Sequence, residues 1–393
     1  MKKTLIIVGA VLLFLALVGF WVYLMFFGGT TGNNPLFTDF SIGIGEQPET
    51  IIPETTTPAL LPQVDTSGEA LRQLTTRPVA GFQYIETAGL GLIKYAEVGT
   101  GHVYEINLAT GEEARISGTT IPRVVEAVFS AEGTTVALVS ESGYVQDVYV
   151  GDIVTDGDGA GFIDGVNLPP NARVAALSST TVWYHSSDLD GTTVFAMDTN
   201  TLEQREVAIV PFSDVVITVT NDSVLVTNAA TSEFEGALYQ SNGGSLLPLT
   251  PSAYGFSAFI NQKYFITTVL EEDRALSSAV NRSDDSTQPL SIVALPEKCD
   301  SDSFSNELIW CGAPIQDPPI ETIENWYQGT TGLPDALWKT NLFSGESTLI
   351  SNLSSEAGRI IDVIALQYAE GIDNAFFINK IDGTLWQYDN LAK

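Results

Sequence analysis

A five-residue pattern recurs along most of the chain and constrains its fold more than any other feature. The pattern reads aliphatic, aromatic, any residue, any residue, then Asn or Asp. Its six copies occupy residues 103–107, 148–152, 194–198, 238–242, 337–341 and 385–389. The aromatic positions are separated by 45, 46, 44, 99 and 48 residues. Because 99 residues span two periods, we expect a seventh, degenerate copy near residue 289, with residues 290–293 as its strand.

Each period contains about four short, β-branched or aromatic segments that end in turns. Gly111 and Gly345 lie in two of these turns, where glycine supplies the positive φ that tight hairpins require. A period of about 40–50 residues with four strands is typical of one blade of a β-propeller. The sequence therefore predicts an all-β fold over residues 70–393, a seven-bladed propeller of four-stranded blades.

The two ends of this domain predict how the ring closes. The last copy of the pattern ends at Asp389, close to the C-terminus, so the seventh blade lacks an outer strand. Residues 71–75 resemble residues 114–117, the outer strand of the first blade, and both segments lead to a proline, Pro78 and Pro122. We expect residues 70–76 to complete the last blade, because an open ring would expose unpaired strand edges.

A charge-free apolar run occupies residues 5–27. As a helix, its 23 residues would extend about 35 Å, enough to cross a hydrocarbon core of about 30 Å. A cleaved signal peptide is the alternative, but its apolar core is shorter and no A-x-A site follows this run. Lys2 and Lys3 favour a cytoplasmic N-terminus, residues 1–4. We therefore expect an uncleaved single-pass anchor in the cell membrane and an extracytoplasmic C-terminal domain.

The segment between the anchor and the propeller, residues 28–69, is rich in proline, threonine and glutamate. Pro48, Pro53, Pro58 and Pro62 remove backbone donors and disfavour helix and strand. Such a segment is an extended spacer. Threonine-rich segments of this kind can also carry O-linked glycans, and the sequence leaves this alternative open.

Acidic residues dominate the chain outside the apolar run. All 48 Asp and Glu residues lie at or after Asp39, and 15 basic residues accompany them, which gives a net charge of −33. Such a surface repels nucleic acid and attracts basic partners or divalent cations. Solubility is the simpler explanation of the same charge. We expect no nucleic-acid partner.

One turn carries a resemblance to a known group of proteins. The residues Phe129-Ser130-Ala131-Glu132-Gly133 resemble the aromatic-Ser-x-Asp-Gly turn of the WD40-like propellers related to the periplasmic protein TolB. The resemblance extends over about residues 70–393 and concerns the architecture, because the Trp-Asp pair of true WD40 repeats does not recur. It implies a binding platform whose loops contact partners.

Cys299 and Cys311 are the two cysteines of the chain, and they flank a segment that reads as strand, polar turn and strand. Antiparallel neighbours at this separation satisfy the distance requirement of a disulfide, and an extracytoplasmic location permits oxidation. We expect a disulfide, with two unpaired thiols as the alternative.

Residues 156–164 form a weak candidate for a calcium loop. Asp156, Asp158 and Asp164 fall at its first, third and ninth positions, but Ala160 and Asn167 replace two expected ligands. An acidic, glycine-rich turn is the better interpretation, and we expect no cofactor.

The longest interruption of the repeat, residues 312–334, contains the adjacent aromatics Trp326 and Tyr327. Exposed aromatics on a loop often mark a binding site, so these two residues are the candidate partner-binding residues. The alternative is that Trp326 folds back onto its own blade.

The sequence favours a non-enzymatic role. The chain has two histidines, and it contains no G-x-S-x-G or H-E-x-x-H motif. The preferred hypothesis is an interaction or ligand-binding platform in the cell envelope, whose partner is a protein or an envelope polymer. The alternative is an envelope-bound, glycosidase-like hydrolase that uses a pair of carboxylates.

Overall fold

The computed structural model describes residues 69–87, 90–143, 145–155, 161–220, 223–228, 231–242, 245–271, 274–301 and 306–392. The predicted anchor, residues 5–27, and the spacer up to residue 68 lie outside the described residues. Within these described ranges, no helix is long and apolar enough to cross a membrane.

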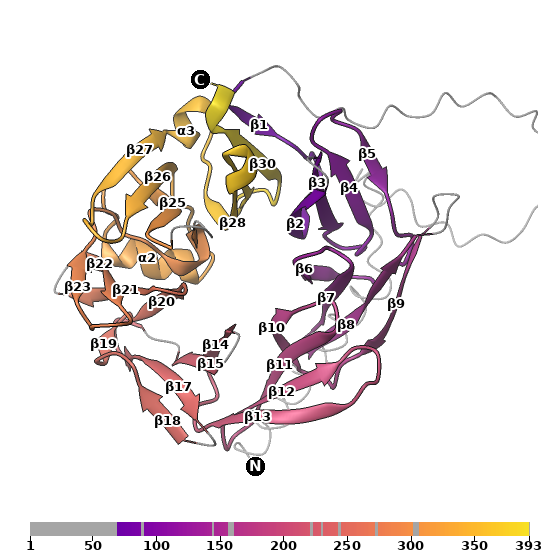
Figure 1. Ribbon diagram of the computed structural model, residues 1–393, viewed down its shortest axis with the longest axis horizontal. Helices are drawn as coiled ribbons and strands as arrows, with labels where there is room; N and C mark the ends of the chain where they lie inside the picture. Colours follow the sequence, from indigo (N-terminus) through magenta and orange to yellow (C-terminus); the bar gives the residue numbers. More distant parts are fainter. Residues whose placement is uncertain are drawn as a thin grey trace, which may run out of the picture. The chain divides into compact units, whose positions relative to one another are not determined.

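Seven four-stranded antiparallel sheets are arranged in a ring, as predicted (Figure 1). The first three blades are β2 (Val79–Thr87), β3 (Leu90–Glu97), β4 (Val103–Asn107), β5 (Glu113–Arg115); β6 (Val124–Phe129), β7 (Thr135–Ser142), β8 (Val145–Val154), β9 (Phe162–Asn167); and β10 (Arg173–Leu177), β11 (Thr181–Ser187), β12 (Thr192–Asp198), β13 (Gln204–Val210). The next two are β14 (Val215–Thr220), β15 (Ser223–Asn228), β17 (Leu238–Asn242), β18 (Ser245–Pro248); and β20 (Ser257–Ile260), β21 (Tyr264–Glu271), β22 (Arg274–Asn281), β23 (Thr287–Pro289). The last two are β24 (Cys299–Ser301), β25 (Leu308–Pro314), β26 (Asp335–Asn341), β27 (Ser347–Ser351); and β28 (Val363–Ala369), β29 (Asn374–Asn379), β30 (Leu385–Asp389), β1 (Leu71–Gln73).

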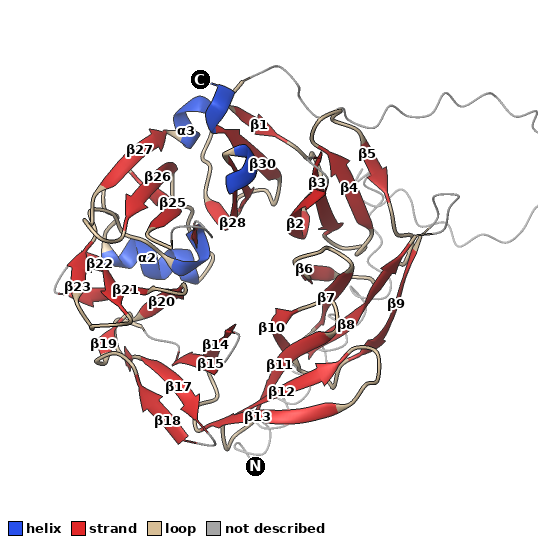
Figure 2. Cartoon of the chain, viewed as in Figure 1, coloured by secondary structure: helices blue, strands red, loops and turns tan. Residues whose placement is uncertain are grey.

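Short elements connect these strands or follow the last of them. They are the two-stranded pair β16 (Glu235–Gly236) and β19 (Ala253–Tyr254), the helices α2 (Ile320–Tyr327) and α3 (Leu353–Glu356), and the 3-10 turns η1 (Pro296–Lys298), η2 (Glu370–Ile372) and η3 (Asn390–Ala392) (Figure 2).

The N-terminal strand closes the ring, which confirms the prediction for residues 70–76. β1 pairs antiparallel with β30, with Leu71 opposite Tyr388 and Gln73 opposite Trp386. The main-chain nitrogen of Leu74 also donates to the oxygen of Leu385 at 2.7 Å. The last blade therefore contains strands from both ends of the domain.

The first and the last residue of the five-residue pattern each have a structural role. It lies in the third strand of six blades, where its first residue, such as Val103 or Leu385, is fully buried between blades. In several copies the final Asn or Asp caps the turn that follows: Asn107 Oδ1 accepts hydrogen bonds from the main-chain nitrogens of Ala109 and Thr110. Asp198 and Asn341 bond their own turns in the same way. The side chain thus fixes the hairpin to the outer strand.

The prediction placed the degenerate seventh copy in the wrong segment. Residues 290–293 lie in a connection between blades, whereas the third strand of the fifth blade is β22. There the apolar pair is replaced by Ser277 and Ser278, and only the final Asn281 of the pattern remains. Ser277 Oγ is buried and bonds Thr268 Oγ1 at 2.6 Å and the main-chain nitrogen of Ala294 at 2.8 Å. A polar contact replaces the apolar one, so the pattern is not visible in the sequence.

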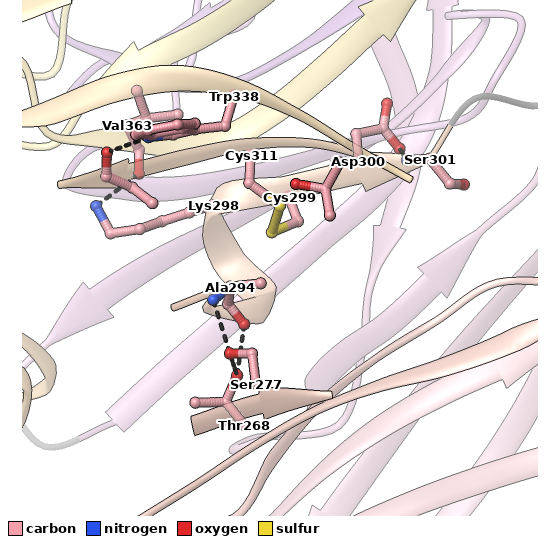
Figure 3. The surroundings of a disulfide bond; sticks show 12 residues. Thr268, Ser277, Ala294, Lys298, Cys299, Asp300, Ser301, Cys311, Trp338 and Val363 are labelled. Carbon is pink, nitrogen blue, oxygen red and sulfur yellow. Dashed lines mark hydrogen bonds between the residues drawn. A yellow bond between two sulfur atoms is a disulfide. The ribbon is translucent and has the colours of Figure 1, made fainter. Parts of the chain in front are cut away.

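The disulfide prediction is confirmed. Cys299 in β24 lies directly opposite Cys311 in β25, and their sulfurs are bonded (Figure 3). Closing a loop of this length stabilises a fold by about 3 kcal/mol in the chain-entropy model.

Side chains bridge the inner strands of neighbouring blades. Gln367 of β28 bonds the main chain of β2 twice, donating to the oxygen of Phe82 and accepting from the nitrogen of Tyr84. Asp300 of β24 accepts from the main-chain nitrogen of Tyr368 in β28 at 2.8 Å. These bonds satisfy main-chain groups at strand edges that have no further strand beside them.

The chain direction gives the ring two different ends. Because strands alternate in direction within a blade, the turn between the second and third strands lies at the same end as the connection to the next blade. The pairing of β16, from such a turn, with β19, from such a connection, shows the two kinds of loop in contact. We call this end the connection end.

Asp300 predicts a pH dependence of stability. Burial raises the pKa of its carboxyl to about 6, although the main-chain nitrogens of Tyr368 and Ser301 oppose this shift. Because the pKa of this carboxyl is higher in the folded than in the unfolded state, the folded protein favours the protonated form. The stability contributed by this group is therefore fully present below the unfolded pKa, about 4, and is lost as the pH rises through the folded pKa, about 6. Denaturant unfolding of the wild type and Asp300→Asn between pH 4 and pH 7 should show it. We expect the wild type to lose up to about 3 kcal/mol relative to the variant over this range. Parallel pH profiles would contradict the assignment.

Candidate functional site

The insert between β25 and β26 forms the helix α2 at the connection end. Pro318 and Pro319 precede the helix and Glu321 lies in its first turn, which are common features of a helix start. Ile323 and Trp326, three residues apart, face inward and pack with Val293, Leu295 and Leu333. The helix therefore lies on the propeller with its apolar face covered.

Of the two alternatives for Trp326, the structure shows the one in which the ring folds back and is buried. Its side chain is 2% exposed. The indole Nε1 donates to both oxygens of Asp362 at 2.9 Å, and the ring lies close to two ammonium groups, Lys380 Nζ at 3.7 Å and Lys298 Nζ at 4.6 Å from its centroid. The apolar ring prefers this buried site because cations attract its π face and a carboxylate accepts its N–H.

Tyr327, the second predicted binding residue, stays at the surface. Its side chain is 48% exposed, and its hydroxyl donates to Glu297 at 3.1 Å. On the same helix, Glu324 accepts a hydrogen bond from the main-chain nitrogen of Ser232, in the loop of the fourth blade. α2 therefore joins a loop of the fourth blade to its own sixth blade and to the connection that enters that blade.

A buried ionic cluster lies beneath α2. Lys298 Nζ contacts Asp335 Oδ2 at 2.6 Å, Asp362 Oδ1 at 2.5 Å and the main-chain oxygen of Val363 at 3.2 Å, the last contact visible in Figure 3. All three charged side chains are fully buried. Burial raises the pKa of Asp335, and the charge of Lys298 opposes the shift. Removing one member would leave a buried charge without its partner, which is strongly destabilising.

The cluster joins the two walls of a groove. One wall belongs to the insert and the other to the connection that contains α3. Asp362 accepts from the main-chain nitrogen of Leu333, and the nitrogen of Asp335 donates to the oxygen of Ile361 at 2.8 Å. Ser354 Oγ donates to the main-chain oxygen of Asp335 at 3.4 Å. These bonds hold the walls at a fixed separation.

The groove has a volume of about 860 Å³ and opens to solvent. The insert lines it with Pro314–Pro319, Thr322 and Gly332–Pro334, and the connection lines it with Asn352, Ser354, Ser355 and Gly358–Ile360. Ile315 and Ile360, one from each wall, are about half exposed. The insert thus lines a groove, and neither Trp326 nor Tyr327 is among the residues that line it.

Exposed apolar side chains concentrate at the connection end. Its loops carry eight of them: Val98, Leu189, Phe234, Tyr254, Ile315, Tyr327, Ile360 and Ile381. In the described part of the opposite end, the loops carry Leu202, Phe343 and Leu391. Exposed apolar side chains are therefore more numerous at the end that carries the groove.

Neither of two candidate places in the described residues offers a hydrolytic pair of carboxylates. Asp335 and Asp362 converge on one lysine, but both are fully buried and neither lines the groove. A second cavity, of about 220 Å³, is lined by one carboxylate, Glu126, together with Arg173 and His185. Burial and the nearby Arg173 lower the pKa of His185 to about 4, so its ring is neutral at pH 7. Glycosidases need two carboxylates facing one bond, and neither place supplies them.

The calcium candidate lies partly outside the described residues. Asp156 and Asp158 lie outside the described residues. Asp164 lies in β9, opposite Asp152 of β8. Among the residues that the structure describes, no group of three acidic, His or Cys side chains is arranged to hold a metal ion.

Comparison with known proteins supports the fold. No protein-family model matches the chain, and no curated protein sequence matches it. The β-propeller domain of the Trilobed protease from Pyrococcus furiosus is similar, with 10% identity and a TM-score of 0.51 over 80% of this chain and 96% of that chain. An oligogalacturonate lyase in complex with manganese is also similar, with 11% identity and a TM-score of 0.53 over 81% of this chain and 92% of that chain.

A TolB protein is also among the similar solved structures. TolB from Acinetobacter baumannii is 12% identical, with a TM-score of 0.42 over 63% of this chain and 58% of that chain. The Pyrococcus domain is described as having an open velcro topology, whereas here β1 and β30 close the ring. At such identities, these similarities concern architecture alone.

The two adjacent aromatics should differ sharply when each is replaced by Ala. Trp326→Ala removes a buried ring and leaves Asp362 without one of its donors, so we expect a loss of about 3–5 kcal/mol of unfolding free energy. Tyr327→Ala should cost less than about 1 kcal/mol, because half of its side chain is exposed. Denaturant unfolding measures both, and equal effects would contradict the described packing of α2.

Proposed function

We propose that this protein is a membrane-anchored, extracytoplasmic binding platform that contacts a protein or an envelope polymer with the connection end of its propeller. Residues 5–27 are the anchor in this proposal, and residues 28–69 are the spacer that carries the propeller away from the membrane. Two features at one end of the ring support the binding role: the larger number of exposed apolar side chains and the groove of about 860 Å³.

The geometry of the groove supports recognition. Its walls are held by the hydrogen bonds of Ser354, Asp335 and Asp362, all of them within the folded domain. A preformed surface loses little conformational entropy when it binds, which favours affinity. The β-propeller fold itself hosts unrelated functions, so the proposal depends on the surface of this chain and not on its structural neighbours.

The anchor is tested by protease accessibility. Because Lys2 and Lys3 favour a cytoplasmic N-terminus, protease added to intact cells or spheroplasts should degrade the propeller after the spacer is cleaved. The measurement is an immunoblot of a C-terminal tag, with a cytoplasmic protein as the control for lysis. A protected C-terminus, or a propeller released by washing at high salt, would contradict the proposed topology.

The binding surface is tested by site-specific photocrosslinking in the native membrane. A photoreactive residue at Ile360 or Phe234, on the connection end, should form adducts with one recurring partner, because these exposed side chains lie on the proposed surface. Phe343 and Leu202, exposed on the opposite end, serve as matched controls and should form few adducts. Adducts from the opposite end alone would overturn the proposed orientation.

A further inference from the structure

Prolines interrupt the insert wall of the groove. Pro314, Pro318, Pro319 and Pro334 all line it, and none has an N–H group. A partner strand that adds to a sheet edge needs a regular row of donors and acceptors. The insert wall therefore favours recognition of the partner's side chains over strand addition.

Two isoleucines define the apolar part of the groove. Ile315 is 50% exposed on the insert, and Ile360 is 51% exposed on the connection. Burying such side chains is favourable because it removes apolar area from water. A branched aliphatic side chain of a partner, placed between the two walls, would bury both isoleucines at once.

The charged part of the groove is negative. Arg359 lines it, but its guanidinium forms an ion pair with Asp382 at 2.9 Å and lies 4.8 Å from the centre of the Trp386 ring. Asp317 also lines it, and no Lys or Arg lies within ion-pair distance of its carboxylate in the part of the chain that the structure describes.

We propose that the groove binds an extended segment of a partner protein in which a branched aliphatic residue lies beside Lys or Arg. This inference depends on the proposed binding role and names its partner by chemistry. The aliphatic side chain packs against Ile315 and Ile360, and the cationic side chain is attracted by Asp317. The chain as a whole, with a net charge of −31, favours the approach of a basic partner. A volume of about 860 Å³ suits a few residues and not a folded domain.

Three labelled ten-residue peptides test the specificity on the full-length protein in detergent or nanodiscs, with fluorescence anisotropy as the measurement. The first contains Lys and Ile, the second replaces Ile by Ser, and the third replaces Lys by Glu. We expect the first peptide to bind at least about 10-fold more tightly than the other two. If the Ser peptide binds equally well, the attraction is general charge and the groove proposal is wrong.

Substitutions in the groove test whether the peptide binds there. The double substitution Ile315→Ser and Ile360→Ser, at two half-exposed positions, should weaken binding of the Lys–Ile peptide about 10-fold or more. Asp317→Lys should reduce the preference of the protein for the Lys–Ile peptide over the Glu peptide. Phe343→Ser, on the opposite end, is the matched control and should bind as the wild type does. Circular dichroism and melting temperature confirm that each variant is folded.

The outcome separates this inference from the proposed function. If the peptides bind without regard to Ile315, Ile360 and Asp317, while photocrosslinks from Ile360 and Phe234 still trap a partner, the groove proposal fails and the platform stands. If neither end forms adducts in the membrane, the platform itself fails.

Discussion

The ring depends on the pairing of β1 with β30. A propeller blade cannot cover its own two faces, so each blade needs a neighbour on both sides, and only a closed ring supplies one to every blade. Here the seventh blade receives its outer strand from the other end of the domain, through three register pairs and the Leu74–Leu385 bond. Two core clusters flank this blade and include Leu71 and Leu74, so the short strand also completes the packing.

The sequence predicts most of this architecture because its pattern has a local cause. The buried first residue of each copy and the final Asn or Asp that caps a turn are needed in most blades, so they recur at the blade period. The fifth blade, which lacks the full pattern, shows where such prediction fails: in β22, Ser277 obtains its contacts from Thr268 and Ala294. Hydrogen-bonded partners from other segments leave no periodic signal in the sequence.

The site was less predictable than the fold. A long insert with adjacent aromatics correctly indicated a departure from the repeat, but not the orientation of its side chains. Trp326 is buried because Asp362 and Lys380 come to it from the next blade, 36 and 54 residues away in sequence. Lys298 and Asp335 carry no local motif either. Contacts that form only when two blades pack together leave no regular spacing in the sequence. The two cysteines were predicted correctly because they lie on adjacent strands of one blade.

The position of the groove follows from the same geometry. The sixth blade contributes the insert, and its connection to the seventh blade contributes the opposite wall, so the groove lies beside the blade that closes the ring. Arg359, on that wall, bonds Gln73 of β1 and lies over Trp386 of β30. The wall that would contact a partner is therefore attached to the strand pair that holds the ring together. A partner bound between Ile315 and Ile360 would join the insert to the closing blade, and binding would oppose opening of the ring because it stabilises only the closed form.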